Sequence, residues 1–110
     1  NQDNEAEAKL ETKLNGTEHA LPEYLEQAIE GYNYALKFDL TYRSQIMLRQ
    51  QIAFCQERLN RNEDAIETYK KIISLCEMHP KDLTPTLKVV QKMANLKYDN
   101  LNEQKSKSEK

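Results

Sequence analysis

The sequence predicts an all-α protein built from antiparallel helix pairs. Apolar residues recur at helical spacing over most of the 110 residues, whereas alternating runs of Val, Ile and Thr that would indicate strands are almost absent. Only two glycines and three prolines occur. A mean hydropathy of −0.90 with 31% charged residues favours thin helical layers over a thick globule. We therefore expect a helical stack of about five helices.

Two segments of the chain share one pattern. Residues 28–36 and 65–73 both begin Ala-Ile-Glu and place a Tyr four residues after the Ala. Ala28 and Ala65 are 37 residues apart (65 − 28), close to the roughly 34-residue period of helix-pair repeats. One supersecondary unit is thus predicted to occur twice.

The first element expected is an acidic segment over residues 1–21. Ala6, Leu10 and Leu14 lie at steps of four, so this segment is predicted to be either a helix with one narrow apolar stripe or a flexible chain. Gly16 follows the last apolar residue, and glycine is enriched just past helix ends.

The second and third elements are amphipathic helices. Pro22 suits a first helical turn, and the helix that it begins should run to about Phe38. Asp39 or Thr41 can cap the next helix. The two helices are expected to bury similar stripes: Leu25, Ile29, Tyr32 and Leu36 in the first, and Leu48, Ile52, Cys55 and Leu59 in the second.

The fourth and fifth elements have clear boundaries. Asn60 to Asn62 form a turn with Asn62 as a candidate N-cap, and Pro80 stops the fourth helix. Thr84 and Pro85 begin the fifth as N-cap and first-turn proline, and residues 102–110 are predicted to be a disordered tail after a domain spanning residues 22–101. The expected buried positions are Ala65, Tyr69, Ile72 and Cys76, flanked by Ile66 and Ile73, in the fourth helix and Leu87, Val90, Ala94 and Leu101 in the fifth.

Residues 59–69, Leu-Asn-Arg-Asn-Glu-Asp-Ala-Ile-Glu-Thr-Tyr, resemble the turn and second helix of tetratricopeptide repeats. Asn60 stands where Gly is usual, Ala65 is the small close-packing residue and Tyr69 is the aromatic. The Ile52-Ala53 step resembles the family's Leu-Gly step. The resemblance covers residues 22–80 and has departures: Arg49 replaces a large hydrophobe, Gln56 replaces an aromatic, and Pro80 falls about three residues late.

The resemblance implies a scaffold that binds a peptide or helix of a partner protein on the concave face of its first helices. The residues expected to line that face are Tyr42, Arg49, Gln50, Phe54, Lys88 and Lys92. Residues 1–39 carry nine acidic and three basic side chains, whereas residues 40–110 carry nine acidic and thirteen basic ones. Because the expected face lies in the basic part of the chain, an acidic partner is expected. Some family members grip the C-terminal carboxylate of chaperones with a Lys/Asn/Arg clamp, of which this sequence keeps only a charge outline, so a chaperone adaptor is a weaker expectation.

Composition excludes several classes of function. A net charge of −2 argues against nucleic-acid binding, and the longest apolar runs are too short for membrane insertion. Cys55 and Cys76 are expected to be reduced thiols of a cytoplasmic protein, in a chain that reads as a piece of a larger one. The sequence contains neither a phosphate loop nor a Ser/His/Asp set, so no enzyme and no cofactor is predicted.

Two alternatives to a peptide-binding scaffold stay open. The same apolar stripes would serve a structural or self-associating helical domain. They would also suit a helical bundle of the microtubule-interacting-and-trafficking type, which binds short helices and needs no repeat.

Overall fold

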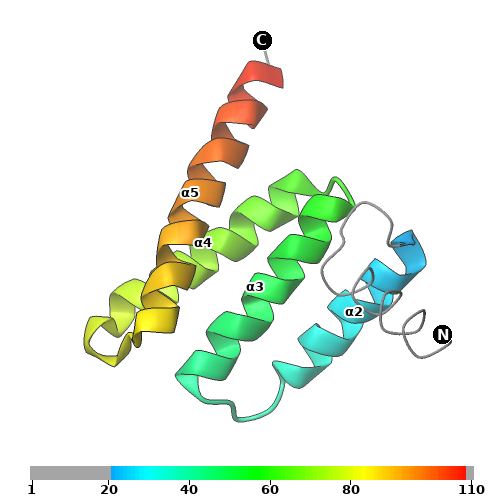
Figure 1. Cartoon of the computed structure of the whole chain (residues 1–110). Coiled ribbons are helices and arrows are strands. Elements are labelled where there is room, and N and C mark those ends of the chain that lie inside the picture. The colour runs from blue at the N-terminus through cyan, green and yellow to red at the C-terminus, as the bar shows by residue number, and fades with distance from the viewer. Residues whose placement is uncertain (1–20, 109–110) are drawn as a thin grey trace, which may run out of the picture.

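The computed structural model describes residues 21–108, which form four α-helices and one short 3-10 helix (Figure 1). No strand occurs among these residues, so the all-α prediction is confirmed. The segment predicted over residues 1–21 lies, apart from Leu21, outside the described residues. The elements are α2 (Pro22–Ala35), α3 (Tyr42–Arg58), α4 (Asn62–Met78), η1 (Pro80–Asp82) and α5 (Pro85–Ser108).

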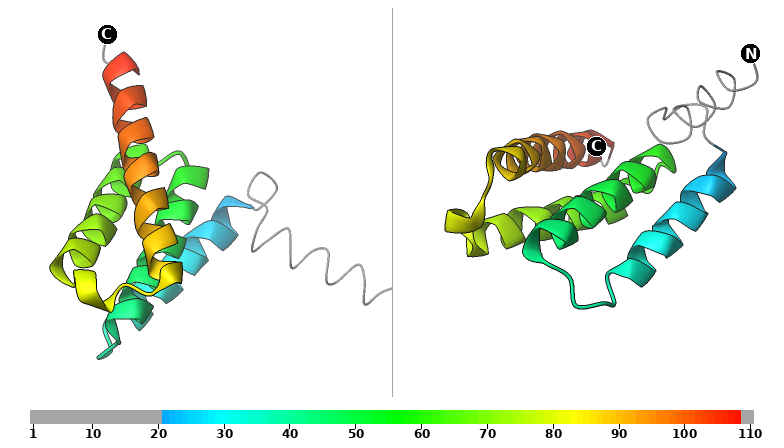
Figure 2. Two further views of the ribbon diagram at one scale, coloured as in Figure 1. Left: turned by 60° about the vertical axis from the view of Figure 1, so that its left-hand side comes forward. Right: turned by 60° about the horizontal axis from the view of Figure 1, so that its bottom comes forward.

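Successive helices run antiparallel and pack side by side (Figures 1 and 2). Helix α3 lies between α2 and α4, and α5 packs on α4 next to α3. Helices α3 and α5, which α4 separates in sequence, also touch at a few points. These few contacts bring together the residues of the candidate site described below.

Three helices begin as the sequence predicts. Pro22 is the first residue of α2. The Thr41 hydroxyl oxygen accepts a hydrogen bond from the Ser44 amide at 3.2 Å, and the Thr84 hydroxyl oxygen accepts one from the Leu87 amide at 3.2 Å. The expected Asn62 cap is wrong, because Asn62 is already the first residue of α4 and no side chain caps that helix. Glu63 and Asp64 in its first turn offset the helix dipole instead.

The turn between α3 and α4 depends on a left-handed residue. Asn60 has φ 59°, and it is the one non-glycine residue with positive φ in the part of the chain that the structure describes. The Arg61 amide donates to the Gln56 carbonyl at 2.8 Å, and the Asn60 amide donates to the Glu57 carbonyl at 3.0 Å. This pair of bonds is a Schellman motif, which satisfies two carbonyls at the end of α3.

Two predicted helix ends are wrong. Helix α2 ends at Ala35, before Phe38, because the amides of Lys37 and Phe38 bond three residues back, in tighter turns. Residues 102–108 are not a disordered tail but the last turns of α5. Lys107 pairs with Glu103 at 3.4 Å within those turns, and lysines near a helix C-terminus offset the dipole. A helix therefore continues beyond the last apolar residue.

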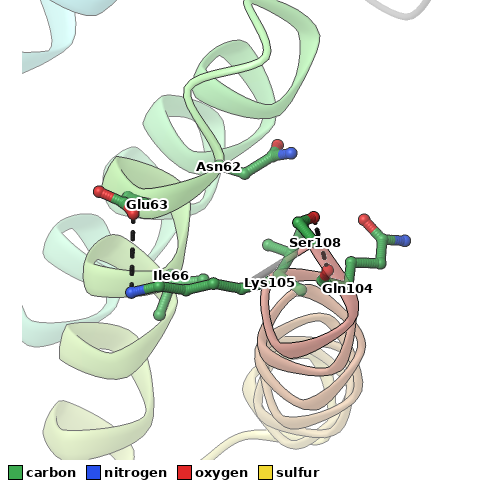
Figure 3. Close-up of a pocket in the computed structure, with 7 residues that line it drawn as sticks. Asn62, Glu63, Ile66, Gln104, Lys105 and Ser108 are labelled. Atoms are coloured by element: carbon green, nitrogen blue, oxygen red, sulfur yellow. Dashed lines mark hydrogen bonds and ion pairs between the residues drawn. The ribbon is translucent and has the colours of Figure 1, made fainter. Parts of the chain in front are cut away.

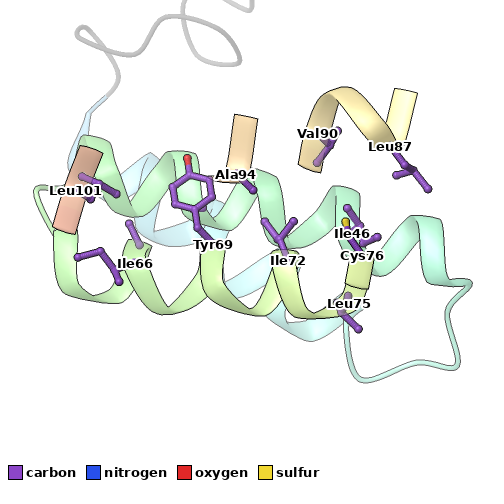
Figure 4. Packing of buried hydrophobic residues seen from close by; sticks show 12 residues of the cluster. Ile46, Ile66, Tyr69, Ile72, Leu75, Cys76, Leu87, Val90, Ala94 and Leu101 are labelled. Carbon is purple, nitrogen blue, oxygen red and sulfur yellow. The ribbon is translucent and has the colours of Figure 1, made fainter. Parts of the chain in front are cut away.

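The core lies where α4 meets α3 and α5 (Figure 4). The stripes predicted for α4 and α5 are confirmed, with Tyr69, Ile72 and Cys76 at most 1% exposed. The stripe predicted for α3 is wrong in part: Leu48, Cys55 and Leu59 are only half-buried. The most buried residues of α3 are Ile46, Gln50, Ile52 and Ala53.

Helix α3 departs from a single stripe because helices cover it on two sides. Its Cys55 lies near Tyr32 of α2, where burial and the thiol raise the tyrosine's pKa. On the other side, Glu57 accepts hydrogen bonds from the Tyr69 hydroxyl of α4 and, at 3.3 Å, from the Lys97 amine of α5. Burial and Glu57 raise the pKa of Tyr69. Glu57 thus joins three helices.

Candidate functional site

Helix α5 carries two apolar stripes, and only one of them faces the core. Leu87, Val90, Ala94 and Leu101 are buried against α4. Three further apolar side chains at i, i+4 and i+7 share a neighbouring face and are exposed: Val89 (61%), Met93 (39%) and Leu96 (60%). A row of exposed apolar side chains on an ordered helix is a common mark of an interaction site.

Helix α3 continues this surface. Gln50 is buried, and its amide nitrogen lies 3.7 Å from the Met93 sulfur. Met47 and Phe54 lie one turn before and after Gln50 on the same side of α3, and both are half-buried and pack on the core. We call the following set the α3–α5 surface: Met47, Gln50, Phe54, Val89, Met93 and Leu96.

Charged side chains border the α3–α5 surface. The Arg58 guanidinium stands 5.8 Å from the centre of the Phe54 ring and donates to the Phe54 carbonyl at 3.1 Å. Next to Arg58, Glu57 of α3 forms an ion pair with Lys97 of α5 at the end of this surface. Lys92 lies one turn before Leu96 and is exposed. The apolar centre is therefore framed mainly by positive charge.

The structure brings some of the predicted site residues together and leaves others apart. Gln50 and Phe54 lie on the α3–α5 surface, and Lys92 lies at its edge. Lys88 is exposed one turn before Lys92, farther from Met93 around the helix. Tyr42 and Arg49 have other surroundings.

Tyr42 is a contact between helices. Its hydroxyl donates to the Leu75 carbonyl of α4 at 2.6 Å, and its ring centre lies 4.6 Å from that of His79. Burial and the neighbouring Cys76 raise the pKa of Tyr42 to about 12. The side chain thus ties the start of α3 to the end of α4.

Arg49 lies on a different face of α3 from Gln50. Neighbouring residues of a helix point about 100° apart, and Arg49 shares its face with Ile52 and Gln56. The Thr68 hydroxyl of α4 donates to the Gln56 side chain at 2.6 Å, so this face turns toward α4. The Arg49 Nε atom is buried there with no hydrogen-bond partner among the described residues.

Sequence reasoning missed the apolar part of the site. Val89, Met93 and Leu96 have the helical spacing of a second stripe, so a signal was present. The prediction from the sequence assigned the other stripe of α5 to the core, which the structure confirms, and gave this second stripe no role. The stripe with the small residue Ala94, which permits close helix approach, is the buried one.

The helices differ in the sign of their net charge. Helix α3 has three arginines and one glutamate, and α5 has five lysines and two acidic residues, giving net charges of +2 and +3. Helix α2 has three glutamates and no basic residue, and α4 has four acidic residues and two lysines, giving −3 and −2. The two helices that form the α3–α5 surface are therefore the two positive ones.

A small hollow of about 280 Å³ lies elsewhere, between the start of α4 and the end of α5 (Figure 3). Glu63 and Lys105 line it and pair across it at 3.6 Å. Its other lining residues are Asn62, Ile66, Leu101, Gln104 and Ser108. None of the residues predicted for the site lines this hollow, and its one pair of charges is already matched.

Over residues 21–108, no three His, Cys, Asp or Glu side chains gather as metal ligands would. No helix in the same range is both long enough and apolar enough to cross a membrane.

Comparisons with protein-family models, with curated proteins and with solved structures found no match to this chain.

Proposed function

We propose that this chain is a protein–protein interaction module that binds a peptide or helix of a partner protein on the α3–α5 surface. The observation that carries the proposal is the exposed stripe of Val89, Met93 and Leu96 beside the half-buried Phe54. A partner that covers such side chains removes their apolar surface from water, which favours association.

The α3–α5 surface lies on helices that are packed against the core, so a partner can bind without a change in their conformation. Val89 and Leu96 sit on a helix that is anchored through its buried face by Leu87, Val90 and Ala94. Helical positions hold side chains more precisely than loops do, which lowers the entropy cost of binding. The resemblance to tetratricopeptide repeats points to the same pair of helices, because first helices line the binding face in that family.

Self-association is a second candidate function, and a separate observation favours it. Tyr34 near the end of α2 and Phe38 just after it are 62% and 59% exposed, and their rings pack edge to face with centres 5.3 Å apart. Exposed aromatic side chains are enriched at the centres of interfaces. If this pair mediates self-association, sedimentation equilibrium should show a dimer that Tyr34→Ala together with Phe38→Ala converts to a monomer.

A capture experiment with matched variants tests the proposed function. The immobilised domain is compared with Leu96→Glu on the α3–α5 surface and with Met78→Glu at the end of α4, where Met78 is 66% exposed. A cellular protein retained by the wild type and by Met78→Glu but lost with Leu96→Glu supports the proposal. Equal retention by all three places the contact elsewhere. Unchanged melting temperatures of both variants ensure that the comparison reports binding.

A further inference from the structure

The chemistry of the α3–α5 surface restricts the backbone of what it can bind. The backbone groups of α3 and α5 are bonded within their own helices, and Gln50 is the polar member of the surface. An extended peptide pressed on this surface would leave its own N–H and C=O groups unpaired, which costs free energy when they are buried. A helical segment satisfies those groups internally, so a helix fits this surface better.

The spacing of the exposed residues sets the length of such a helix. Val89 and Leu96 are seven residues apart, which corresponds to two turns or about 10 Å. A partner helix of about three turns, with apolar residues at i, i+3 or i+4, and i+7, presents a matching stripe.

Charge complementarity sets the polar side of the partner. Lys88 and Lys92 on α5 and Arg58 on α3 flank the apolar residues, and they form no ion pair within residues 21–108. Glu57, the one acidic residue of α3, is already paired with Lys97. The acidic residues of α5, Asp99 and Glu103, come after the exposed stripe. The positive charge beside the stripe is thus uncompensated, whereas α2 and α4 carry the negative charge of the molecule.

We infer that the α3–α5 surface binds an acidic amphipathic helix, whose apolar side chains contact Val89, Met93, Leu96 and Phe54 while its carboxylates face Lys88, Lys92 and Arg58. This inference rests on the proposed function and adds the class of partner. The apolar contacts supply most of the affinity, and the charges speed encounter and select against basic segments.

Two synthetic peptides test the inference. Both are about 14 residues long with Leu at i, i+4, i+7 and i+11; the flanking positions are Glu in one and Lys in the other. We expect fluorescence anisotropy to show binding of the acidic peptide at least about tenfold tighter than the basic one. Its affinity should fall as salt rises toward 1 M, where the Debye length is about 3 Å.

Charge-reversal variants localise the effect. Lys88→Glu with Lys92→Glu should weaken binding of the acidic peptide about tenfold and strengthen that of the basic one. The matched control is Lys70→Glu with Lys71→Glu, which makes the same change of net charge at exposed positions of α4. Equal weakening by both pairs would mean that net charge alone acts, and this would overturn the inference.

The outcomes separate this inference from the proposed function. If both peptides bind equally and Leu96→Glu abolishes both, the interaction surface stands and the acidic class of partner is wrong. If neither peptide binds, the inference is wrong, and the capture experiment with Leu96→Glu decides the proposed function by itself.

Discussion

Asn60 shows how one residue sets the path of the chain between α3 and α4. A side chain in the left-handed region costs roughly 1–2 kcal/mol for most residues, whereas Gly adopts it freely and Asn tolerates it. The sequence predicted this turn, because Asn60 stands where tetratricopeptide repeats have Gly. The structure gives the physical reason, a φ of 59° within a Schellman motif.

The effect of replacing Asn60 on stability should therefore depend on whether the new residue tolerates a positive φ. We expect Asn60→Ala to lower the free energy of unfolding by about 1 kcal/mol, and Asn60→Gly to leave it equal or slightly higher. Asn95→Ala, at an exposed position inside α5, is the matched control and should be neutral or mildly stabilising. Urea denaturation measures all three variants. A neutral Asn60→Ala would contradict the role assigned to the turn.

Tyr42 links stability to alkaline pH. Its pKa is raised to about 12 in the folded protein from an ordinary value of 10, chiefly by burial, so folding favours the neutral phenol. The ionised form also loses the donor that bonds the Leu75 carbonyl. Its contribution to stability is therefore complete below pH 10 and is lost as the pH rises through about 12.

Tyr42→Phe tests this linkage. At neutral pH we expect the variant to lose about 1 kcal/mol of stability with the hydrogen bond. Between pH 10 and 12 its stability should fall less steeply than that of the wild type. Urea midpoints across this range give both numbers, with Tyr34→Phe at an exposed position as control. Parallel alkaline slopes for Tyr42→Phe and the wild type would refute the assignment.

At the scale of elements, how well each helix could be predicted depends on how many neighbours it has. Helices α4 and α5 each bury one main stripe, and their predicted core residues are buried as expected. Helix α3 contacts three other helices, so its buried residues are spread around it. The prediction of a single apolar stripe for α3 was wrong for this reason. Gln50 lies beside Met93 of α5, whereas the neighbouring Arg49 faces α4, because one residue along a helix changes the face.

Two leucines of α5 separate a folding role from a binding role. Leu101 is 6% exposed and lies in the core near the start of α4, whereas Leu96 is 60% exposed. We expect Leu101→Ala to cost about 2–5 kcal/mol of unfolding free energy and Leu96→Ala less than about 0.5 kcal/mol. Thermal or urea denaturation of the two variants checks this. Similar losses for both would show that the two stripes of α5 are assigned wrongly.

At the scale of the whole molecule, positive and negative helices alternate along the chain. The sequence showed only that residues 1–39 are acidic and that residues 40–110 are basic on balance. The fold brings the two positive helices, α3 and α5, into direct contact on the buried face of α4 and leaves apolar side chains of α5 exposed beside that contact. The sequence alone does not predict this arrangement, because only tertiary packing decides which helices are neighbours.

The three methionines of the chain report on the central claim directly. Met47 and Met93 belong to the α3–α5 surface, and Met78 lies at the exposed end of α4, on the side opposite the buried Tyr69. Selective labelling of the methionine methyl groups with ¹³C gives one NMR signal for each. Titration with the acidic helical peptide should shift the signals of Met93 and Met47 and leave that of Met78 in place. A shift confined to Met78, or no shift at saturating peptide, would contradict the claim that α3 and α5 form the binding surface.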